Sequence, residues 1–354
     1  MKENLRVLYV GSYKPTYARN KIFIDGLRKN GATVVECNEQ SFGLLKYLRL
    51  ALRLIRLRGT YDVMLVGFPG QEVMFTARLC SSAPIVFDAF TSHYMGYILD
   101  RGYFSPKSFR ATVYRFLDRW SCRLADAVVL DTNAHIDFFV SEFGLPRTKF
   151  HRIFLGANTD LHYPRPEQNN AGLFTVLFWG SFIPLQGTEY IIKAAQLLRD
   201  ESIRFVLIGD GQKRIRDTNE VTRLGLTQVE FPGKVSDEQL AQYIRDADIC
   251  LGAFSEGVKA DSTIQNKIFE ALASRKPLLT IRTTAIAELL IDGKHYISCE
   301  KANPDNLAQK IIRLRDDASL RSTIAENGHR LFCERLTEEH IGADVLRVLQ
   351  ETII

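Results

Sequence analysis

Short apolar runs alternate with longer amphipathic stretches along the first half of the chain. The stretch from Asn20 to Asn30 has apolar positions at helical spacing and is followed by Gly31, a residue type that commonly ends helices. Apolar runs that fit buried strands occupy residues 5–10, 32–36, 63–66, 85–87 and 127–130. This alternation predicts a parallel sheet covered by helices on both faces.

A second series of the same kind follows a polar stretch between Asn158 and Gly172 that contains Pro164, Pro166 and Asn170 and is typical of a linker. Its apolar runs occupy residues 174–178, 205–208, 228–231, 249–253 and 277–281, and residues 305–354 have a helical pattern throughout. The pattern predicts two α/β domains, residues 1–165 and 173–337, and a final helix at about 338–354.

Length and composition agree with this division. A chain of 354 residues is too long for one ordinary core, and its 46% hydrophobic content predicts a globular protein. The net charge of +5 is too small to indicate nucleic-acid binding. Six cysteines without paired spacing are expected to be reduced and mostly buried. Because no run of 18 apolar residues occurs, we expect a cytoplasmic protein.

The second half carries motifs of a known family. They are Gly180-Ser-Phe-Ile-Pro-Leu-Gln-Gly187, Gly209-Asp-Gly211, Phe231-Pro-Gly-Lys-Val235 and Ala260-Asp-Ser-Thr-Ile-Gln-Asn-Lys-Ile-Phe-Glu-Ala-Leu-Ala273. From Phe174 onward the chain resembles the donor-binding domain of GT-B glycosyltransferases, in particular family 4. The resemblance implies two Rossmann-like domains facing across a cleft, with the last helix crossing back to the first domain.

The resemblance also implies an activity. It is transfer of a sugar, with retention of configuration, from a nucleotide-sugar to a glycan or lipid-linked acceptor, as in polysaccharide biosynthesis. The nucleotide would bind the second domain, the acceptor would enter from the first, and neither a metal nor another cofactor is expected.

The last of these motifs suits a diphosphate. Ile264, Gln265 and Asn266 are expected to open a helix whose N–H groups and positive end face the phosphates. Lys267 would add a positive charge that stabilises the leaving group. Glu270, one turn later, would accept hydrogen bonds from the ribose hydroxyls, as the family's second motif glutamate does.

The sequence departs from the family at three positions. Ser262 stands where the first motif glutamate is expected, and Ser181 and Gln186 stand where a basic pair usually neutralises the diphosphate. Lys259 and Lys267 flank the predicted helix start and are the expected replacements.

Other donor contacts are expected in the glycine turns. The resemblance assigns Gly180, Gly209 and Gly211 to loops around the phosphates and nucleoside, and Lys234 and Val235 to the edge of the base. The triplet Asp246-Ala-Asp248 spells a metal-binding pattern of a different glycosyltransferase fold, but here it ends a helix and enters a strand, so we interpret it as structural.

The first half is expected to hold the acceptor. Gly11 and Ser12 follow the first strand without a GxGxxG pattern, which argues against a dinucleotide; they either approach the donor or simply end the strand. Arg19 is a candidate for binding an anionic group; the alternative is an ordinary surface arginine. Asp88 and His93 follow the strand 85–87. Asp88 is a candidate base, and its alternative role is to cap the following segment. His93 is a candidate sugar ligand, and its alternative role is structural. Later, Asp131 and Thr132 are expected to cap the helix that follows.

The segment Leu44 to Arg58 has one basic and one apolar helical stripe. The basic stripe contains Lys46, Arg49, Arg53 and Arg56, and the apolar stripe contains Leu45, Leu48, Leu52 and Ile55. Such a helix can lie on an anionic bilayer, which would place the protein peripherally at the inner face of the membrane. It is equally compatible with a packed helix whose basic face is solvated.

Two other functions fit the same fold. A nucleotide-sugar epimerase would need acid and base groups on the sugar ring. A non-catalytic glycosyltransferase-like subunit would explain the absent glutamate and basic pair. Fold alone does not separate these functions from sugar transfer.

Overall fold

The computed structural model describes residues 4–165 and 172–353, which form two compact units. The first contains the chain up to Gly156 together with the segment from Leu336 onward, and the second contains Ala157–Arg335. The chain therefore leaves the first unit before the predicted linker. Pro166 and Asn170 of that linker lie outside the described residues.

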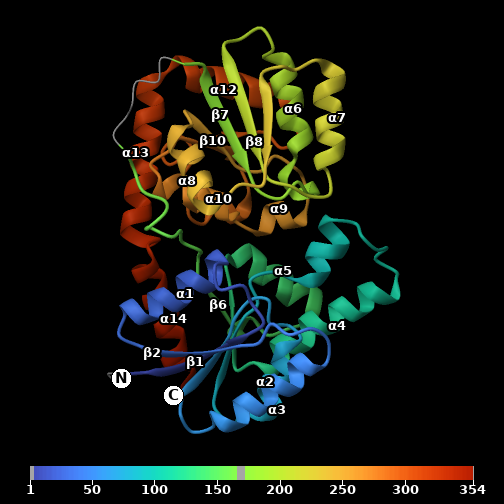
Figure 1. The fold of residues 1–354 in the computed structure, drawn as a ribbon, viewed down its shortest axis with the longest axis vertical. Helices are drawn as coiled ribbons and strands as arrows, with labels where there is room; N and C mark the ends of the chain where they lie inside the picture. The colour runs from blue at the N-terminus through green and yellow to red at the C-terminus, as the bar shows by residue number, and fades with distance from the viewer. Residues whose placement is uncertain (1–3, 166–171, 354) are drawn as a thin grey trace. The chain divides into compact units, whose positions relative to one another are not determined.

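A six-stranded parallel sheet forms the centre of the first unit (Figure 1). Its order is β2 (Thr33–Asn38), β1 (Arg6–Gly11), β3 (Val63–Val66), β4 (Ile85–Asp88), β5 (Ala127–Leu130) and β6 (Phe150–Arg152). The apolar runs predicted the first five of these strands. The edge strand β6 was not predicted, because Phe150 is its only apolar residue.

Right-handed crossovers place the helices of this unit on two faces of the sheet. The helices after β2, β3, β4 and β5 are α2 (Leu45–Arg56), α3 (Val73–Cys80), α4 (Phe109–Leu124) and α5 (Asn133–Phe143), with the π-helix η1 (Tyr94–Asp100) before α4 and the 3-10 turn η2 (Arg147–Lys149) after α5. These connections run along the sheet in one direction. The connection through α1 (Ala18–Lys29) runs in the other, so α1 lies on the opposite face.

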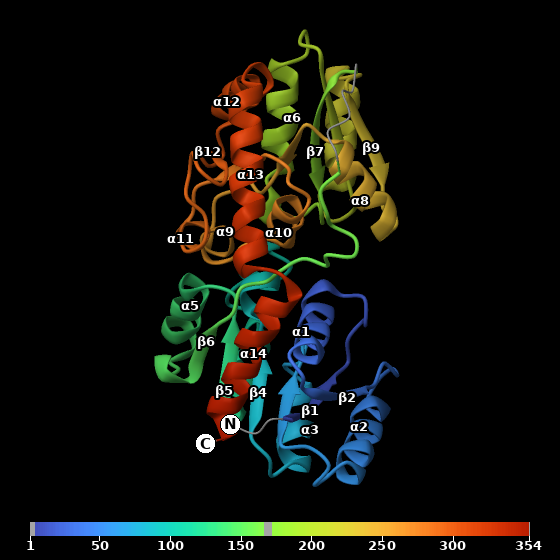
Figure 2. The same cartoon turned by 90° about the vertical axis from the view of Figure 1, so that its left-hand side faces the viewer.

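The last helix, α14 (Glu338–Ile353), returns to the first unit and lies beside α1 (Figures 1 and 2). The two backbones approach so closely that a Cβ atom on Gly26 would lie 2.2 Å from the Glu338 carbonyl oxygen, and one on Gly342 would lie 2.1 Å from the Gly26 carbonyl carbon. The predicted return of the final helix is confirmed, and a pair of glycines makes this close packing possible.

The second unit is built around another six-stranded parallel sheet. Its order is β12 (Ile297–Cys299), β11 (Leu278–Ile281), β10 (Ile249–Leu251), β7 (Phe174–Trp179), β8 (Ile203–Ile208) and β9 (Val229–Gly233). Five of these strands were predicted, and the short edge strand β12 was not.

Eight α-helices surround this sheet within the described residues. They are α6 (Thr188–Leu197), α7 (Arg214–Leu224), α8 (Asp237–Asp246), α9 (Val258–Ser262), α10 (Asn266–Ala273), α11 (Thr284–Ala287), α12 (Pro304–Asp316) and α13 (Ala318–Arg335), and the 3-10 turn η3 (Pro184–Gln186) precedes α6. The tail that was predicted as helical throughout is thus three helices, α12, α13 and α14. Asp317 separates the first two.

Each unit has its own hydrophobic core against its sheet. Five cysteines are buried, as predicted, whereas Cys333 is exposed. Over the described ranges, every helix is too short or too polar to span a bilayer.

Candidate functional site

The strand order of the second unit reverses between β7 and β10. The chain runs from β7 outward through β8 and β9, and then returns to β10 on the other side of β7. In open parallel sheets, ligands bind at the carboxyl ends of the strands where such a reversal occurs. The loops that follow β7, β8 and β10 therefore form the candidate site of this unit.

Glycines hold these loops in direct backbone contact. A Cβ atom on Gly209 would lie 2.0 Å from the Gly180 carbonyl oxygen, and one on Gly211 would lie 2.7 Å from the Phe182 amide nitrogen. All three glycines have a positive φ, between 127° and 152°, a backbone conformation that residues with a side chain rarely adopt. The close approach of the loops after β7 and β8 thus depends on these glycines.

Glu270 is fixed beside this reversal. Trp179, the last residue of β7, donates a hydrogen bond from its indole Nε1 to Glu270 Oε2 at 2.5 Å. The tryptophan is buried, whereas Glu270 in α10 is partly exposed. The carboxylate therefore has one fixed oxygen and still reaches the surface, where it can accept hydrogen bonds from a ligand.

Lys267, which was expected to add a positive charge at the diphosphate, is buried. It is 4% exposed, its Nζ donates to Gln186 Oε1 at 2.6 Å, and it lies 3.7 Å above the centre of the Phe178 ring. Burial lowers the pKa of Lys267 well below the usual lysine range, while the nearby carboxylate of Glu270 acts in the opposite direction. Gln186 is likewise buried. The two side chains bind each other, and neither reaches the surface of the second unit.

Gly180 lies directly over this buried ammonium. A Cβ atom at Gly180 would come within 3.3 Å of Lys267 Nζ, so the loop backbone and the lysine are in close contact. The Nζ is also 3.5 Å from the Gly252 carbonyl oxygen at the end of β10. The Lys267 amino group therefore lies between the end of β10 and the loop that follows β7.

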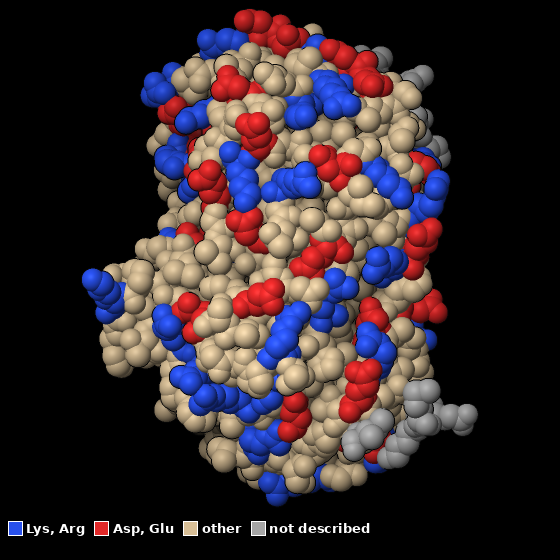
Figure 3. Space-filling view, turned by 180° about the vertical axis from the view of Figure 1, so that it is seen from behind, with Lys and Arg blue, Asp and Glu red and all other residues tan. Residues whose placement is uncertain are grey.

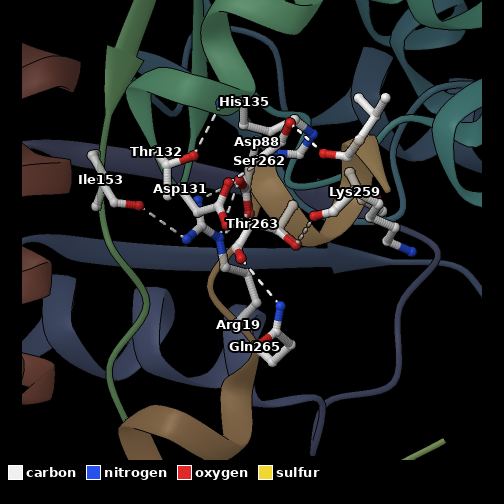
Figure 4. Close-up of polar contacts among 12 residues, drawn as sticks. Arg19, Asp88, Asp131, Thr132, His135, Ile153, Lys259, Ser262, Thr263 and Gln265 are labelled. Atoms are coloured by element: carbon white, nitrogen blue, oxygen red, sulfur yellow. Dashed lines mark hydrogen bonds and ion pairs between the residues drawn. The ribbon is translucent and has the colours of Figure 1, made fainter. Parts of the chain in front are cut away.

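The start of α10 matches its prediction within two residues. The helix begins at Asn266 after Gln265, and Ile264 is buried. The side chain of Gln265 donates to the Thr263 carbonyl oxygen instead of capping the helix (Figure 4). Ser262, where the family has a glutamate, is buried and donates to the Val258 carbonyl oxygen within α9.

The other expected donor residues lie on the surface of the same unit. Ser181 is exposed and Lys259 is half-buried. Lys234, 78% exposed, lies 3.4 Å from Asp210, so an ion pair connects the loops after β8 and β9; Val235 follows it.

The triplet at Asp246–Asp248 is structural, as interpreted. Asp246 ends α8 and accepts from the Gln242 amide, and Asp248 accepts from the Thr175 amide nitrogen. Among the residues described by the structure, no three His, Cys, Asp or Glu side chains are grouped for a metal.

In the first unit the strand order reverses between β1 and β3. Gly11 ends β1, and Ser12 follows it. The next residue, Tyr13, is buried: its hydroxyl donates to Glu36 Oε2 at 2.8 Å, and its amide nitrogen donates to Asn38 Oδ1. The loop after β1 is thereby held against the end of β2.

Arg19 and Asp88 form a completely buried ion pair. Figure 4 shows the guanidinium of Arg19 against the carboxylate of Asp88, with both Nη2 and Nε bonded at 2.8–3.2 Å and Nη1 donating to the Ile153 carbonyl oxygen. Both side chains have 0% exposure. Burial raises the pKa of Asp88, and Arg19 opposes this effect. Because each group already binds the other, the geometry does not support Arg19 as an anion ligand or Asp88 as the base.

His93 lies apart from that pair, in an aromatic cluster. Its ring stacks on Tyr97 at 5.6 Å and contacts Tyr114 at 5.9 Å. Its amide nitrogen and the hydroxyl of Ser92 donate to the buried Asp118, which fixes the start of η1. His93 is half-buried, and its Nδ1 is buried without a hydrogen-bond partner among the described residues.

Three polar residues of interest were not identified from the sequence. His135 Nδ1 lies 2.7 Å from Asp131 Oδ1, so Asp131 orients the imidazole ring of His135. Thr132 caps α5, as predicted. His162 is buried, which lowers its pKa, and Glu270 is near enough to raise it. The position of His162 in the predicted linker did not indicate a role, and Trp179 was seen only as the residue that follows a predicted strand.

Comparison with known proteins agrees with this architecture. Residues 174–317 match the family model of glycosyl transferases group 1. An uncharacterized glycosyltransferase of Methanocaldococcus jannaschii is 30% identical over 200 residues, 56% of this chain and 53% of the relative. The alpha-D-kanosaminyltransferase of Streptomyces kanamyceticus is 25% identical over 251 residues, 68% of this chain and 64% of the relative. The chain thus spans about half to two thirds of the length of these relatives.

Solved structures cover nearly the whole chain. Anabaena HepE in complex with UDP and glucose superposes with a TM-score of 0.75 over 98% of this chain and all of the other, at 19% identity. Sucrose-phosphate synthase from Thermosynechococcus elongatus gives 0.75 over 98% of each chain, at 14% identity. The predicted GT-B fold is therefore confirmed, and within the second unit residues 174–317 match the glycosyl transferases group 1.

Proposed function

We propose that the protein transfers a sugar from a nucleoside-diphosphate sugar to a glycan or lipid-linked acceptor with retention of configuration. In this reaction the bond between the anomeric carbon and the diphosphate breaks, a bond to the acceptor oxygen forms on the same face, and the hydroxyl proton leaves with the diphosphate. The second unit would bind the donor, and the first would bind the acceptor through the region of His93.

One observation carries the donor half of this proposal. The Glu270 carboxylate is held by Trp179 at the strand reversal, on the helix that also carries Lys267. A fixed, partly exposed carboxylate is suited to accept two adjacent ribose hydroxyls, and the loops after β7 and β8 end at the same strand reversal, where backbone N–H groups would bind phosphates. We propose UDP as the first nucleotide to test, because the structural neighbour HepE was solved with UDP.

Lys267 would act from beneath the loop. Its ammonium lies under the Gly180 backbone, where its charge adds to the potential at the loop without occupying the phosphate site. Stabilisation of the departing diphosphate by this charge and by backbone N–H groups needs no metal, which stays a prediction.

Calorimetric titration of the purified protein with UDP, GDP and ADP tests the donor site. We expect one nucleotide to bind, and Glu270→Ala to weaken that binding roughly 10- to 100-fold, the range expected for lost hydrogen bonds to a charged group. Glu334→Ala is the matched control, because Glu334 is also an exposed helical glutamate of the second unit but lies in α13.

Two outcomes would contradict sugar transfer. Absence of nucleotide binding would favour a non-catalytic subunit. Nucleotide binding together with isomerisation of the donor sugar, in the absence of acceptor, would identify an epimerase.

A further inference from the structure

The helix α2 is exposed on its apolar side. Leu45, Leu48, Leu52 and Ile55 are 49–60% exposed, and Phe42 and Leu44 just before the helix are 97% and 84% exposed. Only Leu50 and Leu54 of α2 are buried in the core. The apolar stripe therefore does not stabilise the fold, and an ordinary packed surface helix does not explain it.

The exposed apolar surface continues beyond α2. The neighbouring helix α3 packs against both α2 and α4, and it exposes Leu79 at 82%. In α4, Phe109, Phe116 and Trp120 recur along one side and are 82%, 51% and 39% exposed. Phe116 stacks on Phe75 of α3 at 6.3 Å, which joins the two helices into one surface. We call the exposed side chains of Phe42 to Ile55, Leu79 and Phe109 to Trp120 the apolar face.

Lys and Arg outnumber Asp and Glu in the two segments that carry most of the apolar face. Residues 42–58 contain five Lys or Arg and no Asp or Glu, and residues 101–124 contain six Lys or Arg and one acid, Asp118, which is buried. Three arginines of the face or its border, Arg53, Arg78 and Arg115, pair with Glu39, Asp126 and Glu142. By contrast, Figure 3 shows the side opposite the viewer of Figure 1, where Lys and Arg are mixed with Asp and Glu over much of the surface.

We propose that the apolar face docks on an anionic lipid bilayer. Leucine, phenylalanine and tryptophan enter the boundary between headgroups and acyl chains, while arginine and lysine beside them bind the lipid phosphates. A second copy of the chain is a poor occupant, because a symmetric pair would bring the same positive charges together. This proposal does not depend on the identity of the donor.

The test is cosedimentation of the full chain with vesicles of phosphatidylcholine alone or mixed with phosphatidylglycerol. We expect binding to the mixed vesicles only, weakened by salt. Replacing Leu48→Ser and Leu52→Ser together should weaken binding at least about tenfold. Replacing Arg49→Gln and Arg56→Gln should weaken it roughly 25-fold, since each basic group near an anionic surface contributes about fivefold.

The matched control replaces exposed apolar residues of the second unit. Leu197→Ser with Ile215→Ser removes side chains that are 54% and 77% exposed and should leave vesicle binding unchanged. Circular dichroism melts of all variants check folding. The proposal is overturned if the chain binds neither vesicle, which would leave an acidic protein as the partner, or if the Leu48 and Leu52 variant binds as well as the control.

Discussion

Buried charged side chains in both units bind partners inside their own unit. Arg19 and Asp88 bind each other without any exposed surface, and Lys267 binds Gln186 above an aromatic ring. A buried ion pair is weak evidence for stability, but removal of one partner is costly because the other charge remains without compensation. These residues are therefore the place where structural and catalytic roles can be separated by mutation.

The first prediction concerns Asp88. Asp88→Asn leaves the Arg19 guanidinium buried without a counter-charge, and we expect it to lower the free energy of unfolding by about 3–5 kcal/mol in urea titrations. The double replacement Arg19→Met with Asp88→Leu should lose less, because no charge is left buried. A variant Asp88→Asn of normal stability that has lost sugar transfer would instead restore Asp88 as the base.

The second prediction concerns Lys267 and pH. Burial lowers its pKa in the folded protein, so between that lowered value and the ordinary lysine value the unfolded chain binds more protons. The contribution of Lys267 to the free energy of unfolding should therefore rise with pH across that window. Lys267→Met removes this contribution, and urea titrations at a series of pH values should show the two stability curves diverge in favour of the wild type as pH rises. Parallel curves would mean that the lysine is not perturbed.

Residue roles could be predicted from the sequence only where a local motif carried them. Glu270 was identified because helix spacing and the surrounding motif point to it. The partner of its carboxylate, Trp179, lies 91 positions away, and Asp88 lies 69 positions from Arg19. No local pattern reports such contacts, so two residues assigned to the acceptor proved to be each other's partners.

At the scale of elements, glycines set how closely the loops and helices approach. Gly209 lies against Gly180 at the strand reversal, and Gly26 lies against Gly342 where α1 and α14 meet. In each place a single methyl group would collide with backbone. The candidate donor site and the return of the last helix thus depend on the absence of side chains.

The third prediction tests this dependence. Gly225→Ala should cost about 1 kcal/mol, because its φ of 65° is unfavourable but the space around it is open. Gly209→Ala should cost at least about 2 kcal/mol more, since the added Cβ atom also collides with the Gly180 carbonyl oxygen. Thermal or urea unfolding of both variants measures the difference. Equal losses would show that the loops move apart without cost.

Strands could be predicted from the sequence wherever burial on both faces of the sheet requires apolar residues throughout the strand. Ten of the twelve strands lie in apolar runs, whereas β6 and β12 are short strands at sheet edges with few apolar residues. The helical pattern of the tail was read correctly, but its division at Asp317 was not, because the periodicity continues across the break.

At the scale of the whole molecule, the second unit is one continuous segment and the first is not. The chain leaves the first unit after Gly156 and re-enters it at Leu336. These two residues are adjacent: a Cβ atom on Gly156 would lie 2.2 Å from the Leu336 carbonyl oxygen. The predicted boundary lay later in the chain, because proline and asparagine mark a polar segment but do not mark where packing changes.

The fourth prediction is that deletion of residues 336–354 affects the two units unequally. The first unit loses the buried side chains of Ile341, Val345 and Leu349 and should lose more than about 5 kcal/mol of stability. The second unit should be unaffected. Hydrogen exchange measured by mass spectrometry reports on each unit separately. Equal loss of protection in both units would contradict the prediction that the second unit is stable without residues 336–354.

The same interrupted connectivity orders events during protein synthesis. When the ribosome has made residues 157–335, every strand and helix of the second unit is available to fold. The first unit must still wait for α14, which follows the second unit in the chain and packs on α1, which precedes it. The unit whose synthesis starts first is therefore completed after the other one, and until then the nascent protein exposes the side of α1 that α14 will cover.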